Sequence, residues 1–178
     1  ERNRGWAKVA LDSTRPLLNR AIAGVYPPAS VFKLVTSGAG LEHGLLSVNK
    51  YYPHLCDGGY RFGNRYQKCW GVHGNLNVVN ALRLSCDVYF YQAGLEIDME
   101  RINEFGRRFG LGEEVLGIDI PGERRGWLPD SASFNKRNKR SGWRWARGLI
   151  LNLSIGQGQL VTPLQQAVLV GSLATNAG

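Results

Sequence analysis

The sequence predicts a mixed α/β fold of the α+β type, in which helices dominate and a few strands need residues outside this chain to complete their sheet. Three observations favour this fold. Helix-capping residues precede several apolar segments, a region rich in Gly, Tyr and Asn lacks helical period, and no repeat interrupts the chain. The chain has 178 residues, of which 43% are hydrophobic, enough for one domain or part of a larger one.

The first part of the chain predicts one long helix between less regular segments. The opening "WAKVAL" alternates weakly and predicts a strand, followed by a polar loop to Ala23. The prolines of "YPPAS" stop any earlier element, and a helix is predicted from about Ser30 to His43, ending at Gly44. Residues 47–75 have no helical period and predict a loop with short strands.

Three further helices are predicted, two of them from their caps. Asn77 can cap a helix over 78–84, and a second helical stretch is predicted over 88–96. Asp98 can cap "MERINEFGRRFG", which has one apolar face and stops at Gly110. The sequence therefore predicts a helix-rich segment between residues 78 and 110.

The end of the chain predicts one more helix. "GIDIPGE" predicts a short strand or turn, and Thr162 and Gln165 of "TPLQ" fit a capping box with Pro163 in the first position. The helix that follows, to about Ala174, is apolar on nearly every side, and we expect it to be buried.

The chain is basic, with a net charge of +8 that favours anionic surroundings. Much of the excess lies in residues 135–148, "NKRNKRSGWRWARG", where cations alternate with two tryptophans. This stretch is consistent with a patch for polyanions or a bilayer surface, but a solvated loop is the commoner case and the one we favour. No apolar run reaches the ~20 residues of a membrane-spanning helix, and "ERNRGWAKV" lacks the apolar core of a signal peptide.

The strongest candidate for chemistry is "YPPASVFK". Ser30 and Lys33 are three residues apart, so on a helix both side chains share one face. A serine hydroxyl needs an adjacent base to become a nucleophile, and a lysine serves only when neutral, which burial among the apolar neighbours would promote. Unpaired backbone N–H groups at the helix start can stabilise an oxyanion. The apolar context "VFKLV" favours a functional pair over a solvated helix face.

A second candidate is "SCD", in which Ser85 lies 55 residues after Ser30. On its own, the pair Ser85 and Asp87 would be interpreted as caps between two helices. Taken with Ser30-x-x-Lys33, the chain resembles the penicillin-recognising serine acyl-transferases, which share S-x-x-K, S-x-N or S-x-D, and a K-[ST]-G strand. Within them it is most similar to the elongation-specific branch of class B penicillin-binding proteins, through "RPLLNRAIAGVYPPASVFK", "GNLNVVNALRLSCDVYFYQ" and "TPLQ" in that order.

The resemblance implies a role for each motif residue. Ser30 is the acyl-forming nucleophile and its backbone N–H an oxyanion donor, Lys33 is the base, and Ser85 relays a proton to the leaving amine. Asp87 hydrogen-bonds the substrate or positions the lysine. The implied fold is the transpeptidase fold, a helical cluster packed on an antiparallel sheet that is incomplete in this chain.

Three departures from the family pattern bear on these expectations. Ala29 stands where glycine is common before the nucleophile, and Asp87 replaces the more widespread Asn. No K-T-G or K-S-G triplet occurs, so residues 1–178 are expected to be part of one transpeptidase domain, without the third motif and its flanking strands.

The three cysteines and one histidine form the pattern C-x12-C-x3-H-x12-C. Cys56, Cys69, His73 and Cys86 would make a Cys3His set, which is normal for structural zinc, although the spacing fits no standard finger. The same residues are also compatible with a Cys56–Cys69 disulfide that leaves a free third thiol, or with Cys86 as a small buried hydrophobe. Some relatives in this branch bind zinc beside the active site, so the resemblance favours zinc.

Two histidines are left without a firm assignment. His43 is expected at the surface, at a helix end, and His54 is the substitute ligand if His73 is not one. If zinc is bound at Cys86, it would hold the backbone between the two motif residues that flank this cysteine. It would also tie the irregular 47–75 segment to the catalytic helix.

The resemblance implies a peptidoglycan D,D-transpeptidase that cross-links peptide stems through a serine acyl-enzyme and is acylated by β-lactams. It implies no organic cofactor, a catalytic domain in the bacterial periplasm, an inner-membrane anchor in the parent chain, and a membrane glycosyltransferase partner of the elongation machinery. Two rival functions remain: a serine β-lactamase or penicillin-sensor domain, and a zinc-stabilised nucleic-acid-binding module. The nucleic-acid rival leaves both serine motifs unexplained, so no nucleic-acid partner is expected.

Overall fold

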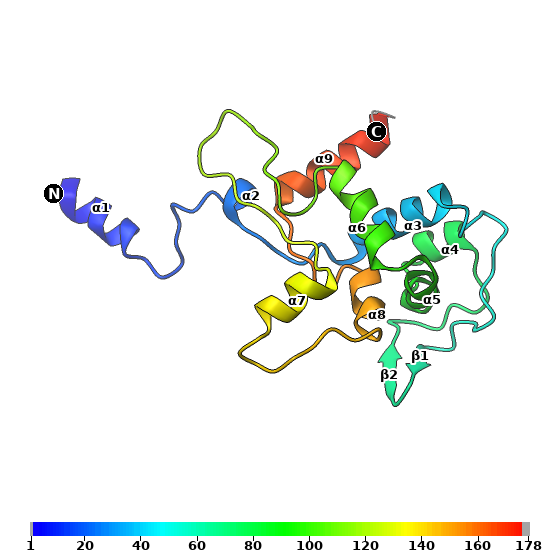
Figure 1. The fold of residues 1–178 in the computed structure, drawn as a ribbon. Coiled ribbons are helices and arrows are strands. Elements are labelled where there is room, and N and C mark those ends of the chain that lie inside the picture. The colour runs from blue at the N-terminus through cyan, green and yellow to red at the C-terminus, as the bar shows by residue number, and fades with distance from the viewer. Residues whose placement is uncertain (1, 176–178) are drawn as a thin grey trace.

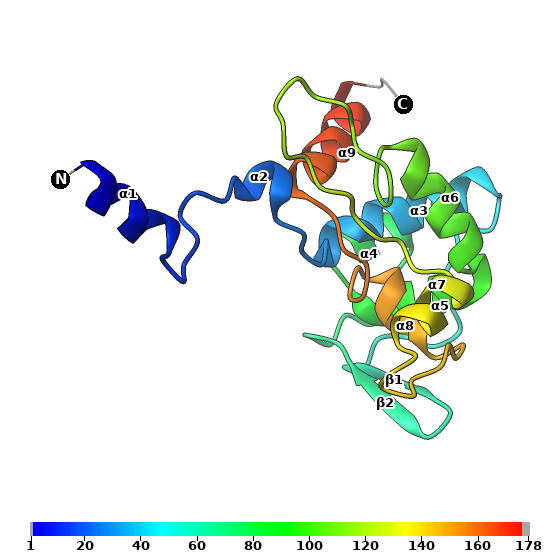
Figure 2. The ribbon, with the colours of Figure 1, turned by 60° about the vertical axis from the view of Figure 1, so that its left-hand side comes forward.

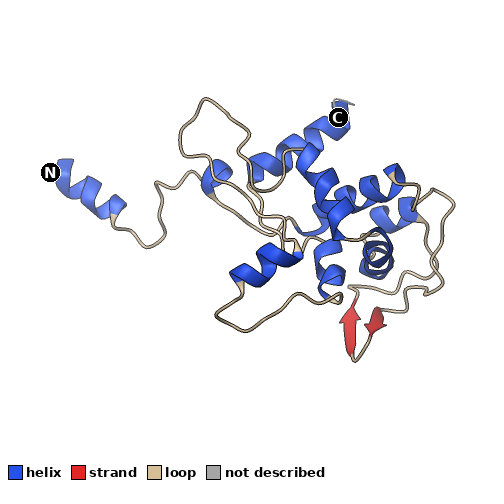
Figure 3. Ribbon diagram, in the orientation of Figure 1, coloured by secondary structure: helices blue, strands red, loops and turns tan. Residues whose placement is uncertain are grey.

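The computed structural model describes residues 2–175 as a cluster of helices with one β-hairpin at its edge (Figure 1). The elements in chain order are α1 (Arg2–Ala10), α2 (Arg20–Ala23), the short 3-10 turn η1 (Ala29–Val31), α3 (Phe32–Glu42), β1 (Gly59–Phe62), β2 (Arg65–Lys68), α4 (Val78–Arg83), α5 (Asp87–Ile97), α6 (Met99–Arg108), α7 (Ser131–Arg137), α8 (Leu149–Ser154) and α9 (Pro163–Thr175). The mixed fold class expected from the sequence is confirmed, with a sheet of only two strands among the described residues (Figure 3).

Helix α5 is the centre of the core. It packs against α3, α8 and β1, and its side chains are buried on nearly every side, with Phe90 and Ile97 fully excluded from solvent. Gly94 allows α8 to come close, because a Cβ at this position would lie 2.4 Å from the Cβ of Ser154. Since α5 begins at Asp87, this packing gives the start of the helix a rigid support.

Helix α6 covers the other side of α3. Ile102 and Phe105 face the core, and the Phe105 ring occupies the space that a side chain at Gly38 of α3 would need. Asp98 accepts a hydrogen bond from Arg101 N at 3.1 Å, so the predicted cap is confirmed, and Gly110 has the positive φ of 78° expected after the helix.

The hairpin β1–β2 is antiparallel, with Phe62 opposite Arg65 across the two-residue turn Gly63-Asn64. Gly63 has a φ of 59°, which a turn of this length requires. The hairpin packs on α5 through the rings of Tyr60 and Tyr91. The prediction of short strands within 47–75 is therefore confirmed.

Most predicted helices are confirmed at their caps. Asn77 accepts from Asn80 N at 3.0 Å at the start of α4. In the box at the start of α9, Gln165 N donates to the Thr162 hydroxyl and Thr162 N donates to the Gln165 side chain, both at 3.1 Å. Among the described residues, no helix is long and apolar enough to cross a membrane.

The prediction of a strand at "WAKVAL" is wrong, because all of these residues except Leu11 lie in helix α1. Figures 1 and 2 both show α1 standing away from the other helices. The side chains of residues 5–10 are exposed, with Trp6 at 64%. No described strand lies beside α1 to pair with it in the extended conformation that the weak alternation of apolar residues predicted.

The expectation that α9 is buried is also wrong. Only Gln165 and Leu169 of this helix are buried, whereas Val168, Val170 and Leu173 are 36–45% exposed. Among the described elements, α2 is the main helical neighbour of α9, so one face is covered and the other apolar faces are not.

Candidate active site and the adjoining cysteine–histidine cluster

Ser30 lies in the 3-10 turn that opens α3, with its side chain exposed. One turn later, Lys33 is 1% exposed, and its Nζ lies 3.3 Å from the Ser30 hydroxyl oxygen. The helical spacing therefore brings the two groups together as the sequence predicts. The serine faces solvent while the amine is held inside.

The second motif meets the first from a distant part of the chain. Lys33 Nζ lies 2.9 Å from Ser85 Oγ, donates to the Ser85 carbonyl at 2.8 Å, and pairs with Asp87 Oδ1 at 2.6 Å. Ser85 Oγ lies 3.0 Å from Ser30 Oγ. Three of the four residues expected to be catalytic thus converge on the buried amine of the fourth, Lys33.

The number of contacts at Lys33 limits its chemistry. Four oxygens from three residues lie within 3.3 Å of Nζ, but an ammonium has only three hydrogens to donate. A neutral amine can donate to the Ser85 carbonyl and Asp87, and accept a proton from a serine hydroxyl with its lone pair. The longest contact, 3.3 Å to the Ser30 hydroxyl, leaves the amine close to the group that a base would have to deprotonate.

A backbone cradle that sequence reasoning missed holds the start of the catalytic helix. Ala29 N donates to Gly156 O at 3.1 Å, and Tyr26 exchanges two 2.9 Å backbone hydrogen bonds with Val161. The Thr36 hydroxyl donates to Ser154 O at 2.8 Å. The end of α8 and the segment that follows it therefore fix α3 and the residues before it at three points.

Gly156 is required at the closest approach of the cradle. It has a φ of 80°, and a Cβ there would lie 2.2 Å from Ala29 O and 2.8 Å from the Phe32 Cβ. Any larger residue must displace backbone beside the nucleophile. The glycines of "SIGQGQ" were the available signal in the sequence.

Two residues at the site have a left-handed backbone conformation that is unusual for residues with a side chain. Ala29 has a φ of 50° and Ser85 a φ of 49°. Such a conformation costs roughly 1–2 kcal/mol for an L-residue and persists only where the surroundings enforce it. At Ser85 the conformation allows both the carbonyl and the hydroxyl to face Lys33.

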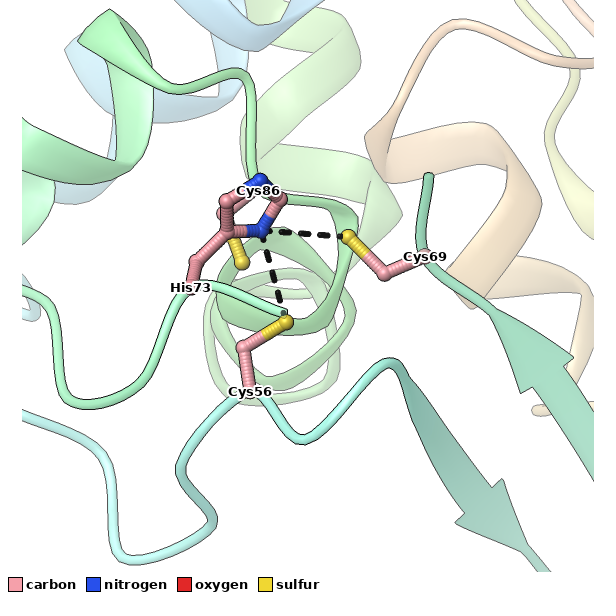
Figure 4. Close-up of side chains that lie close together, drawn as sticks. All are labelled: Cys56, Cys69, His73 and Cys86. Carbon is pink, nitrogen blue, oxygen red and sulfur yellow. Dashed lines mark hydrogen bonds between the residues drawn. The ribbon is translucent and has the colours of Figure 1, made fainter. Parts of the chain in front are cut away.

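The cysteine–histidine cluster consists of Cys56, Cys69, His73 and Cys86 (Figure 4). Their ligand atoms all lie within 4.8 Å of one another. His73 Nδ1 faces two sulfurs, at 3.4 Å from Cys56 and 3.5 Å from Cys69. In tetrahedral zinc sites with bonds of ~2.3 Å, sulfurs lie about 3.8 Å apart, so the donor set fits such an ion in type and spacing.

The environments of the thiols differ. Burial acts to raise the pKa of Cys69, but backbone amides that donate to the sulfur, including that of Asp87, bring it below its ordinary value. Burial raises the pKa of Cys86. All three cysteines are free, so the disulfide alternative is not what the structure shows. His54 lies outside the cluster, with its ring against Tyr60.

The cluster adjoins the catalytic residues directly. Asp87 N donates to Cys69 Sγ at 3.3 Å, and Cys86 lies between Ser85 and Asp87. Trp70, which sequence reasoning missed, donates from its indole nitrogen to the Ser85 carbonyl at 3.1 Å and packs on His73. The irregular segment before α4 is therefore bonded to the backbone that presents the second motif.

Comparison with known proteins gives one family. The model of the penicillin-binding protein transpeptidase domain matches residues 2–177. The chain is 36% identical over 160 residues to the peptidoglycan D,D-transpeptidase MrdA of Acinetobacter baumannii, covering 86% of this chain and 23% of the relative. It is 37% identical over 163 residues to MrdA of Escherichia coli K12, covering 88% and 24%. The chain thus spans about a quarter of the length of these curated relatives.

Solved structures agree with the sequence matches. The penicillin-binding protein PBP2 of Helicobacter pylori, solved in complex with MreC, superposes with a TM-score of 0.86 at 36% identity, covering 97% of this chain and 32% of that one. PBP2 of Pseudomonas aeruginosa, solved with WCK 5153, gives a TM-score of 0.85 at 31% identity, covering 96% and 39%.

Proposed function

Because the chain belongs to the family of penicillin-binding protein transpeptidase domains, we propose that it is part of one such domain in a peptidoglycan D,D-transpeptidase. The reaction transfers the acyl group of a peptide stem ending in D-Ala-D-Ala to an amine of a second stem. The observation that carries the proposal is the mutual contact of Ser30 Oγ, Ser85 Oγ and Lys33 Nζ, all within 3.3 Å.

In the first half-reaction, Ser30 Oγ attacks the carbonyl carbon of the penultimate D-Ala, and its proton passes to Lys33 Nζ. The transfer runs directly over 3.3 Å or through the Ser85 hydroxyl, which touches both groups. The oxyanion accepts a hydrogen bond from the Ser30 N–H in the first helical turn. Collapse breaks the peptide bond, and Ser85 delivers the proton to the amine of the departing D-Ala.

In the second half-reaction, the amine of another stem attacks the Ser30 ester. Lys33 and Ser85 accept its proton, and the ester oxygen leaves as the regenerated serine hydroxyl. Asp87 Oδ1 lies 2.6 Å from Lys33 Nζ, which supports the positioning role over direct contact with substrate. A β-lactam acylates the same serine, but its leaving amine stays tethered to the ring-opened adduct, so the adduct persists.

We also propose a structural zinc ion at the cysteine–histidine cluster. Its support is the donor set of three sulfurs and one imidazole nitrogen, all within 4.8 Å, with amide hydrogen bonds that suit a thiolate at Cys69. Bound zinc would supply a fixed cross-link and take no part in acyl transfer. Because Cys86 separates Ser85 from Asp87, this cross-link would hold both side chains toward Lys33.

The proposed setting follows from the relatives. A PBP2 relative was solved with MreC, and another similar structure is a peptidoglycan synthase complex that coordinates polymerization and cross-linking. We propose that the parent protein is anchored in the bacterial inner membrane with this domain in the periplasm. Its proposed partners are peptide stems and a membrane glycosyltransferase of the elongation machinery.

The experiment that tests this function uses the full-length protein with un-cross-linked glycan strands that carry pentapeptide stems. Mass spectrometry should detect free D-Ala together with cross-linked stem dimers, and Ser30→Ala should abolish both while leaving the melting temperature unchanged. Hydrolysed stems without dimers would contradict transfer of the acyl group to a second stem, and a penicillin adduct that hydrolyses rapidly would identify the β-lactamase rival.

A further inference from the structure

A groove lies between the β1–β2 hairpin and the chain that leads into α8, on a surface that the proposed reaction does not use. Figure 2 shows the two segments side by side, and residues of both line one cavity of about 360 Å³. Gly148 lies against the Phe62 ring, since a Cβ there would be 3.5 Å from it. The two segments therefore come close to each other at Gly148 and Phe62, both of which line the groove.

The two segments that form this groove carry charged side chains of one sign, and two of these, Arg65 and Arg144, line it. Residues 59–68 and 135–148 contain no Asp or Glu. Within the part of the chain that the structure describes, no cation of these two segments forms an ion pair. These cations are Arg61, Arg65, Lys68, Lys136, Arg137, Lys139, Arg140, Arg144 and Arg147. A surface of this kind selects an anionic ligand.

The groove lining narrows the class of anion. Arg65 and Arg144 line the groove as exposed guanidinium groups, suited to carboxylates. Trp143 is 59% exposed beside them, an indole face of the kind on which a sugar ring can pack. The amides of Asn64, Gln67 and Asn152 also line it and can bond hydroxyl or peptide groups.

We propose that this groove binds a second stretch of the peptidoglycan polymer, a saccharide carrying peptide carboxylates, outside the catalytic serine. A bilayer surface would meet a protruding apolar or cationic face, whereas this site is concave and lined by amides between arginines. The inference rests on the proposed function, because the polymer cross-linked at Ser30 extends well beyond one stem. The groove would hold that polymer while the stem is acylated.

The test measures binding of full-length protein, acylated beforehand with penicillin, to soluble un-cross-linked glycan strands with pentapeptide stems. Arg65→Gln/Arg144→Gln should weaken binding roughly ten-fold, as expected for the loss of two partly exposed charge pairs. The control Arg124→Gln/Arg125→Gln removes the same charge from exposed positions outside the groove and should bind as the parent does. Trp143→Ala should weaken binding without changing its salt dependence.

Two further probes separate the possible ligands. Glycan strands whose carboxylates have been amidated should bind the protein weakly. Phosphatidylglycerol vesicles should bind it no better than the amidated strands do. Equal losses in the groove variant and the control would overturn the proposal, because net charge alone would then account for binding. Tighter binding to vesicles than to strands would also overturn it, in favour of a bilayer surface.

Labelling with fluorescent penicillin keeps the two proposals apart. The groove variant should label at the parent rate, since neither arginine contacts the catalytic residues. If labelling fails but groove-dependent binding of strands remains, the proposed function falls and the groove stands as a binding site. If labelling succeeds and the groove variant binds strands like the parent, the groove proposal alone falls.

Discussion

Lys33 carries the chemistry at the scale of single residues. Its amine is almost fully excluded from solvent yet touches oxygens of Ser30, Ser85 and Asp87. In the proposed reaction this buried amine both positions the two serines and accepts their protons. These two proposed roles can be separated by substitution, because a guanidinium can donate hydrogen bonds but does not serve as a base.

We predict that Lys33→Ala slows acylation by penicillin roughly 10²–10⁴-fold, the usual range for loss of a general base. Stopped-flow fluorescence with a labelled penicillin measures the rate. Lys33→Arg should be similarly slow, and thermal melting identifies variants that remain folded. A folded Lys33→Arg protein that acylates at the parent rate would contradict the role of the lysine as base.

Gly156 gives a second prediction at this scale. Gly156→Ala should lower the free energy of unfolding by about 2–4 kcal/mol, through overpacking and a strained positive φ. It should also slow acylation, because the displaced backbone belongs to Ala29, next to the nucleophile. Denaturant melts and acylation rates measure the two effects.

The matched control is Gly171→Ala in α9, where no atom lies within 4 Å of the new Cβ. It should raise the free energy of unfolding by up to about 1 kcal/mol, through helix propensity, and leave acylation unchanged. Equal behaviour of the two variants would show that the contact with Ala29 does not position the nucleophile.

Single-residue roles differed in how far sequence could predict them. The pairing of Ser30 with Lys33 follows from helical spacing, which is a local property. The meeting of Ser85 with Ser30, 55 residues apart, was expected only through the family resemblance. Gly156 and Trp70 were missed because their contacts depend on where the chain folds back, which no local pattern records.

Among the structural elements, the irregular segment before α4 is tied to the start of α5 by the cysteine–histidine cluster. Cys69 Sγ accepts a hydrogen bond from the backbone amide of Asp87, so the segment and the catalytic motif are linked even without a metal ion. A metal ion would add a bond to each of the four side chains. The proposed zinc therefore couples the stability of this segment to the geometry of the active site.

Removal of the proposed zinc should lower the melting temperature and slow acylation together. The metal content of the purified full-length protein is measured first, and a chelator then removes it. Added zinc should restore both properties. If a protein verified to be free of zinc acylates at the full rate, the cluster does not position the catalytic residues.

Local start signals account for only some of the predicted helices, because α2 and α7 also begin at side-chain caps, Asn19 and Asp130, and were not predicted. Helices α4, α6 and α9 begin at side-chain caps that the sequence displays. Helix α8 has six residues and no side-chain cap, so nothing in the sequence marked its start. Helix α1 was mistaken for a strand because its alternation is weak and, standing apart, it has no packed face to decide the period.

At the scale of the whole molecule, two distant segments meet on a core built around α5. The first carries Ser30, the proposed nucleophile, and the second carries Ser85 and Asp87, its proposed relay and the proposed positioning carboxylate. The fold class followed from the mixture of capped helices and irregular chain. The exposure of the apolar faces of α9 could not be predicted from the sequence. Composition shows that a helix is apolar, but it does not show which neighbours cover it.

The most direct test of the central claim is the site of acylation in the intact full-length protein. After reaction with a fluorescent penicillin, digestion and mass spectrometry should locate one adduct, on Ser30, that persists for many minutes and is absent from Ser30→Ala. A folded protein that forms no adduct, or forms it equally well without this hydroxyl, would contradict the account.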